Sequence, residues 1–215
     1  MPVVDIFDEV EEELRAERAR RAWRRFGPLM AVVLVLGIGG VAGWQGYAWW
    51  QNRQAQTSAM AFLAAQGVEG SSPADQAARF TLLAAQSPTG YRTLARLRAA
   101  ALQAEAGERN LARATLDQVT GDTGADPIYR DLANLLWVLH GLDDVDPAVL
   151  AARITPLTAP GSAWRASAQE LAALVELRRG HPAEAKRALE ALANDAAAPQ
   201  GVRERALRLS RSIEG

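Results

Sequence analysis

The sequence predicts an all-α protein in which one N-terminal transmembrane helix precedes a solenoid of helical hairpins. Three observations predict this fold class. Alanine and leucine are abundant and β-branched residues are sparse outside residues 28–43, which favours helices over sheets. Residues 26–52 carry no charge. From residue 53 onwards, apolar residues recur at helical spacing between glycine and proline breaks.

The N-terminal tail, residues 1–25, is predicted to be helical. Ile6, Val10 and Leu14 recur every four residues and therefore share one helix face. The tail begins acidic and ends rich in arginine, an order that suits the helix dipole. Two roles remain open for these charges, because they can set the orientation of the following membrane helix or dock a cytoplasmic partner.

Residues 26–50 are predicted to form the transmembrane helix, because about 20 apolar residues cross a hydrocarbon core of about 30 Å. Tryptophans at both ends of this run occupy the positions expected at a membrane interface: Trp23, Trp44, Trp49 and Trp50. Arginines stand immediately before the run: Arg20, Arg21, Arg24 and Arg25. Only Arg53 follows closely. The excess of positive charge on the first side predicts a cytoplasmic N-terminus and an external domain over residues 51–215.

Two other interpretations of this run remain open. It can be a cleaved signal peptide with small residues at 41–43, or a buried core helix. Gly39 and Gly43 form a Gly-x-x-x-Gly pair, which permits close contact between two membrane helices. Simple packing within the membrane is the alternative for this pair.

The external domain shows alternating signals for helix starts and helix stops. Asp or Ser followed by proline opens a helix at Ser72, Asp126 and Asp146. A glycine follows each of several periodic runs as a C-terminal stop: Gly67, Gly107, Gly141 and Gly180. The expected helices cover residues 53–66, 73–86, 91–106, 109–119, 127–140, 147–155, 162–179, 183–194 and 200–213.

An internal repeat links these helices. Gly107 is followed by Ala112 and Leu116 at the same spacings at which Gly180 is followed by Ala185 and Leu189. The 34 residues from Gly107 to Gly141 match the period of tetratricopeptide repeats. The segment after Gly141 lacks this alanine and leucine placement, and an irregular helical bundle is the alternative.

Stacked hairpins of this kind leave a concave surface that binds extended peptides or helices. The two tryptophans of the external domain, Trp137 and Trp164, are candidates either for the core or for anchoring a partner. The expected function of the domain is therefore binding to other proteins.

The composition argues against catalysis. The chain has no cysteine and two histidines, His140 and His181, both of which are expected to be structural. His140 lies at a helix C-terminus, where an imidazolium is favourable. Acidic residues in one turn are candidates for a divalent cation or for a solvated loop, but lack the glycine and glutamate of a calcium loop: Asp143, Asp144 and Asp146. The net charge of −1 does not favour nucleic acid. We expect no cofactor, no metal and no small-molecule substrate.

Several blocks of the sequence carry a family resemblance. They are residues 5–18 (DIFDEVEEELRAER), 23–27 (WRRFG), the apolar run, 162–171 (SAWRASAQEL) and 177–180 (LRRG). In these blocks the chain resembles the TPR-like ancillary subunits of the bacterial Sec translocon in their alphaproteobacterial form. The resemblance covers nearly the whole length.

The resemblance implies a type II protein of the bacterial inner membrane with a periplasmic TPR-like domain. Such a protein would be an adaptor beside the translocation channel that contacts channel subunits or periplasmic chaperones and assists the folding of exported chains. No catalytic residues are defined for this family, so none carry over. The alternative is an envelope scaffold for cell division or membrane-complex assembly that uses the same surface.

Overall fold

A computed structural model describes the backbone of residues 6–67 and 70–213. The chain divides into two compact units, Met1–Gln54 and Ala55–Gly215. The helices of the described chain are α1 (Ile6–Gln66), α2 (Pro73–Gln86), α3 (Thr89–Glu105), α4 (Arg109–Thr120), α5 (Pro127–Gly141), α6 (Pro147–Ile154), the 3₁₀ helix η1 (Thr155–Thr158), α7 (Arg165–Arg178), α8 (Pro182–Ala193) and α9 (Gln200–Ser212). No strand occurs among these residues, so the all-α prediction is confirmed for them.

The first unit consists of the N-terminal part of α1. Its described side chains are those of residues 23, 30, 34, 36–50 and 52–54, and nearly all are exposed. The predicted topology arginines lie outside the described side chains: Arg20, Arg21, Arg24 and Arg25. Within the part of the chain that the structure describes, none of the helices combines the length and the apolar character needed to cross a membrane.

All four predicted interface tryptophans are among the described side chains. Trp23, Trp44, Trp49 and Trp50 are all more than half exposed. A Cβ atom added at Gly39 or Gly43 would meet no atom of the described chain within 4 Å. No packing among the described residues therefore explains this glycine pair, and its role in a helix–helix contact stays a prediction.

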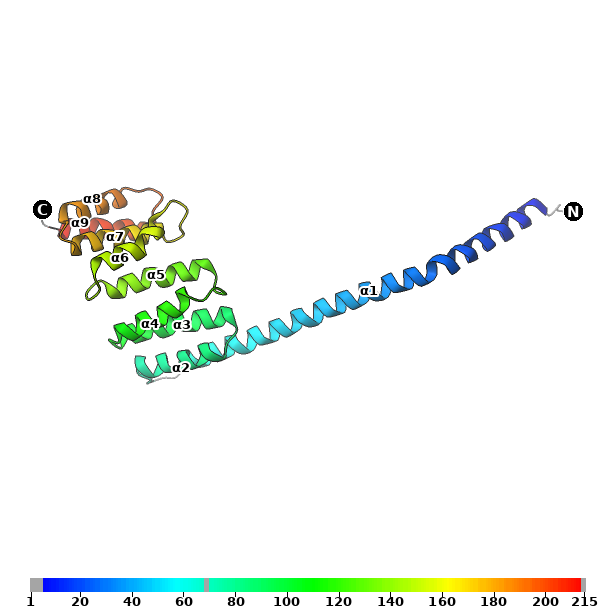
Figure 1. The fold of residues 1–215 in the computed structure, drawn as a ribbon, viewed down its shortest axis with the longest axis horizontal. Coiled ribbons are helices and arrows are strands. Elements are labelled where there is room, and N and C mark those ends of the chain that lie inside the picture. Colours follow the sequence, from blue (N-terminus) through cyan, green and yellow to red (C-terminus); the bar gives the residue numbers. More distant parts are fainter. Residues whose placement is uncertain (1–5, 68–69, 214–215) are drawn as a thin grey trace. The chain divides into compact units, whose positions relative to one another are not determined.

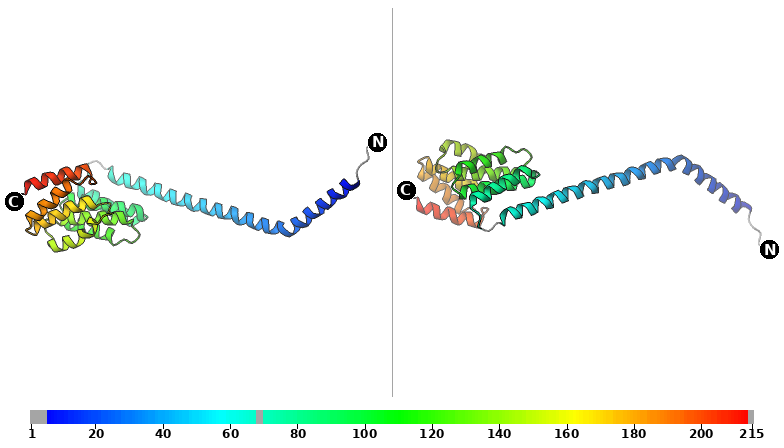
Figure 2. Two further views of the ribbon diagram at one scale, coloured as in Figure 1. Left: turned by 90° about the horizontal axis from the view of Figure 1, so that it is seen from above. Right: turned by 90° about the horizontal axis from the view of Figure 1, so that it is seen from below.

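The second unit is a stack of antiparallel hairpins (Figures 1 and 2). Helices α3 and α4, α5 and α6, and α7 and α8 form three successive hairpins, and α9 packs on α8. The last residues of α1 pack against α2, where the ring of Phe62 meets that of Phe80 edge-on with centroids 5.0 Å apart. From α2 onwards, the observed bounds lie within three residues of the expected ones.

The predicted helix starts are confirmed at three positions. Ser72 accepts a hydrogen bond from the backbone N–H of Asp75 at 3.1 Å. Asp126 and Asp146 each accept one from the backbone N–H two residues on, at 2.9 Å and 2.8 Å. In each case a proline follows the cap, where its missing N–H costs nothing.

Two of the predicted glycine stops have a left-handed backbone. Gly107 has φ of 85° and Gly180 has φ of 82°. The N–H of the residue after each glycine donates to the carbonyl five residues back, at 2.8 Å for Glu108 and 3.0 Å for His181. This closure reverses the chain between the two helices of a hairpin, and positive φ is where glycine has its advantage.

Replacing Gly180 by alanine is expected to lower the free energy of unfolding by about 1–2 kcal/mol, because an L-residue is strained at positive φ. Urea denaturation followed by circular dichroism measures this change. Gly90→Ala is the matched control, because Gly90 lies inside α3 without a positive φ and with no atom within 4 Å of an added Cβ. Equal losses in the two variants would show that backbone strain is not the cause.

Gly141 ends α5 for a different reason. It is buried and its φ is not positive. An added Cβ would lie 3.0 Å from the Cγ2 atom of Val145 and 3.1 Å from the Cδ2 atom of Leu150. Glycine is needed here because two core side chains occupy the space, and not because the backbone turns.

The middle hairpin, α5 and α6, also follows the repeat, although counting residues from Gly141 did not predict this. Its turn is longer, because α6 begins six residues after Gly141, whereas α4 and α8 begin two residues after their glycines. Once the helices are aligned by their starts, Leu150 and Ile154 of α6 occupy the positions of Ala185 and Leu189 of α8. All four side chains are at most 1% exposed.

Candidate interaction grooves

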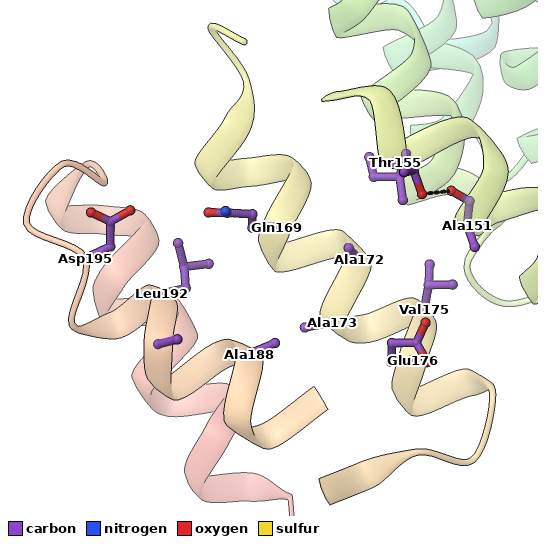
Figure 3. Close-up of a pocket in the computed structure, with 12 residues that line it drawn as sticks. Ala151, Thr155, Gln169, Ala172, Ala173, Val175, Glu176, Ala188, Leu192 and Asp195 are labelled. Atoms are coloured by element: carbon purple, nitrogen blue, oxygen red, sulfur yellow. Dashed lines mark hydrogen bonds between the residues drawn. The ribbon is translucent and has the colours of Figure 1, made fainter. Parts of the chain in front are cut away.

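Two hollows lie between consecutive hairpins of the second unit. The first groove lies between α2, α3 and α4 and encloses about 700 Å³. The last groove lies between α6, α7 and α8 and encloses about 500 Å³ (Figure 3). Alanines make up much of both linings. Small side chains at the surface of packed helices leave room that larger ones would occupy.

The two grooves occupy equivalent positions in the repeat. Arg96, Ala99 and Gln103 of α3 line the first groove. The residues 73 positions further on, Gln169, Ala172 and Glu176 of α7, line the last groove. Gly180 also lies 73 positions after Gly107, so both hollows arise at one register of the hairpin repeat.

The equivalent position in the middle hairpin is filled by Trp137. This residue stands four positions before Gly141, as Gln103 stands before Gly107 and Glu176 before Gly180. Its indole Nε1–H donates to Asp117 Oδ2 of α4 at 3.1 Å. The guanidinium of Arg153 on α6 stacks 4.0 Å from the ring centroid and donates to Asp117 Oδ1 at 2.7 Å. We call these three residues the Trp137 cluster.

In the last groove, other side chains replace the neighbours of Trp137, and one of them is much smaller. Helices α4, α6 and α8 can be aligned by taking their buried residues Leu116, Ile154 and Leu189 as equivalent positions. By this alignment Thr155 of η1 takes the place of Asp117, and Ala188 of α8 takes the place of Arg153. Both line the last groove. The hollow is therefore the space that the Trp137 cluster fills one hairpin earlier.

The structure assigns roles to both candidate tryptophans. Trp137 is half-buried, packs against two core clusters and closes the middle position. Trp164 packs against the core of α5, α6 and α7, and its Nε1–H donates to the carbonyl of Ile128 at 2.9 Å. Both side chains hold hairpins together within the chain.

The acidic turn after α5 serves packing between hairpins. Asp143 pairs with Arg109 of α4 at 2.7 Å, and Asp144 forms a two-point ion pair with Arg113 at 2.5 and 2.9 Å. The hydrogen bond from Arg113 lowers the pKa of Asp144 and in turn raises the pKa of Arg113. Asp146 caps α6. Each acid thus has a partner in the chain, although the carboxylates of both ion pairs are exposed, so each pair contributes little.

The expectation of a favourable imidazolium at His140 is wrong. His140 is half-buried at the C-terminus of α5, and burial, followed by the charges of Arg109 and Arg113, lowers its pKa below the ordinary value of 6.5. The loss of hydration and the two neighbouring cations outweigh the helix dipole. This lowering of the pKa could not be predicted from the sequence, because both arginines come from a different helix, α4.

The free energy of unfolding is expected to decrease as the pH falls from about 7 to about 5.5. In that window the unfolded chain, whose His140 has a pKa near 6.5, binds more protons at this residue than the folded chain, in which burial and two arginines lower the pKa, so protons favour the unfolded state. Urea denaturation across this range measures the slope. The His140→Gln variant, which cannot titrate, should show a shallower slope, and an unchanged slope would contradict the assignment.

A contact that the sequence did not predict closes the α7–α8 turn. His181 Nδ1 lies 2.8 Å from Glu176 Oε2 and 3.7 Å from Glu184 Oε2. The three ligand-type groups lie within 4.8 Å of one another, but Arg179 also pairs with Glu176 at 2.8 Å. Hydrogen bonds from His181 and then Arg179 lower the pKa of Glu176. The group is a hydrogen-bonded cluster at one end of the last groove.

Comparison with known proteins agrees with this hairpin geometry. Residues 20–211 match the family model described as a tetratricopeptide repeat-like domain. The chain belongs to this family. Neither the curated proteins nor the solved structures that were searched gave a significant match. Tetratricopeptide repeat-like domains are protein-interaction modules, which makes the grooves between the hairpins the candidate functional surface.

Proposed function

We propose that this protein is a non-catalytic adaptor that is anchored in a bacterial inner membrane and binds other proteins through its tetratricopeptide repeat-like domain. The observation that carries the proposal is the pair of repeat-equivalent grooves, which stay open where the middle hairpin is closed by its own tryptophan. The grooves offer apolar walls with a few polar groups at their ends, as binding sites for protein segments do.

The membrane anchor is supported by the sequence. Residues 26–52 are uncharged, tryptophans stand at both ends, and arginines precede the run. The side chains of residues 26–29, 31–33, 35 and 51 of this segment lie outside those that the structure describes. In the proposed topology the tail faces the cytoplasm and residues 51–215 face the periplasm.

The finer proposal is association with the Sec translocon and assistance to exported chains or periplasmic chaperones. It rests on the resemblance of residues 5–18 and 23–27 to the ancillary translocon subunits. An envelope scaffold for cell division or complex assembly is the alternative, because the same grooves suit either class of partner.

Photo-crosslinking in living cells tests the adaptor role and its partners. A photoreactive amino acid at Ala191, an exposed residue of the last groove, is expected to capture a defined partner protein. The same group at Ala183, which is exposed on α8 outside both groove linings, is the matched control. Translocon subunits and nascent secretory chains would support the first class, and cell-division proteins the second. Equal labelling from the two positions would contradict binding in the groove.

Cell fractionation tests the anchor separately. The full-length protein is expected to sediment with membranes and to resist extraction at alkaline pH, whereas deletion of residues 26–50 should release it. Recovery of the full-length protein in the supernatant would refute the anchor without affecting the groove.

A further inference from the structure

We infer that the last groove binds a tryptophan side chain presented by a partner protein. The inference rests on the proposed interaction role and specifies the chemistry of the group that enters. Its basis is the middle hairpin, in which this chain shows what fits the equivalent space, an indole ring between the two flanking helices. An alternative occupant, such as a second copy of the chain, is an outcome of the test below.

The dimensions and lining of the groove suit this group. About 500 Å³ lies within the range of roughly 300–1,000 Å³ typical of pockets that hold small ligands. Ala151, Ala172 and Ala188 line the hollow together with Val175 and Leu192, which are almost fully buried (Figure 3). These side chains form an apolar surface against which the faces of an aromatic ring can pack.

A hydrogen-bond acceptor stands where the indole N–H requires one. Thr155 takes the place of Asp117, which accepts the N–H of Trp137. The Thr155 hydroxyl donates to the carbonyl of Ala151 at 2.7 Å, so its oxygen keeps lone pairs for a second hydrogen bond. An indole is therefore favoured over a purely apolar side chain, because its N–H is satisfied on burial.

At the corresponding point of the first groove, two lining residues hydrogen-bond to each other. Gln103 takes the place of Trp137, and Thr115 takes the place of Arg153. The Thr115 hydroxyl donates to Gln103 Oε1 at 2.8 Å in a buried hydrogen bond. In the last groove the equivalent residues are Glu176 and Ala188, and Glu176 instead pairs with Arg179 and His181 in its own turn. The space beside Ala188 consequently remains open.

A fluorescein-labelled peptide of sequence lysine-glycine-tryptophan-glycine-lysine is the probe. Its binding to the full-length protein in dodecyl maltoside micelles is measured by fluorescence anisotropy. We expect this peptide to bind at least about tenfold more tightly than the same peptide with alanine in place of tryptophan, a difference of 1.4 kcal/mol. Equal affinities for the two peptides would overturn the inference.

Variants of the groove locate the site. Ala188→Leu and Ala191→Leu place bulk in the groove and should each reduce the affinity to that of the alanine peptide. Ala183→Leu, on the same helix but outside the groove lining, should leave it unchanged. Circular dichroism confirms that each variant is folded. If both groove variants bind the tryptophan peptide as the unchanged protein does, the site is elsewhere and the inference is wrong.

Sedimentation of the same samples measures the oligomeric state and so tests whether a second copy of the chain occupies the groove. A dimer that dissociates in Ala188→Leu would show that another copy of the chain occupies the groove and would overturn the inference. The two proposals fail separately, since the adaptor role fails when no partner is crosslinked in cells. The indole preference fails when the two peptides bind equally in vitro.

Discussion

Leu189→Ala is expected to lower the free energy of unfolding by about 2–5 kcal/mol. Leu189 is fully buried and packs in one cluster with Ala185, Val202 and Ala206, which joins α8 to α9. Removal of its isobutyl group leaves a cavity between two helices whose backbones cannot close fully around it. Urea denaturation followed by circular dichroism measures the loss.

Leu177→Ala is the control for this substitution. Leu177 lies on α7 with 39% of its surface exposed, so its truncation should change the free energy of unfolding by about 0.5 kcal/mol or less. Because each hairpin contacts mainly its neighbours, hydrogen exchange should accelerate most in α8 and α9 of the Leu189→Ala variant. Similar losses in the two leucine variants would contradict the position of Leu189 in the core.

Trp137→Ala is expected to cost about 3 kcal/mol of unfolding free energy, the lower end of the range for large aromatic truncations, because the ring is only half-buried. Three interactions disappear together: the packing against two core clusters, the N–H hydrogen bond to Asp117 and the stacking of Arg153. The remaining pair of Asp117 and Arg153 would lose the ring that holds it in place. Thermal and urea unfolding measure this effect.

Trp137→Phe separates packing from polar contacts. Phenylalanine keeps an aromatic face for Arg153 but cannot donate to Asp117, so we expect a loss of about 1 kcal/mol, that of one hydrogen bond. If the two variants lose the same free energy of unfolding, the packing of the aromatic ring against α4 and α6 does not stabilise the middle hairpin. The closed state of the middle position would then need another explanation.

Much of the helical architecture could be predicted from local sequence. Asp126 and Asp146 open helices because a short acidic side chain accepts backbone N–H groups of the first turn, and proline tolerates that position. Gly107 and Gly180 end helices because positive φ favours glycine. These are interactions between residues a few positions apart, so the sequence contains them directly.

The repeat was only partly predictable. Spacing from glycine matched the first and last hairpins, but the longer turn after Gly141 moved Leu150 and Ile154 out of that register. The burial of these two side chains in the folded chain shows that they are equivalent to the alanine and leucine of the other hairpins. Equivalent positions of a repeat share the same buried environment even where the turn before them differs in length. The reason for glycine at position 141 also became clear only from the folded chain. Val145 of the following turn and Leu150 of the following helix occupy the space that a Cβ atom would need.

The sequence by itself determined that the chain is helical, where most of its helices begin and end, and that its hairpins repeat. The tertiary structure alone decided that Trp137 contacts both Asp117 and Arg153, that burial and two arginines lower the pKa of His140, and that small residues leave a groove beside α7. The physical reason is the range of the interactions. Helix ends depend on neighbours in the chain, whereas grooves and shifted pKa values depend on side chains brought together from helices up to several tens of residues apart.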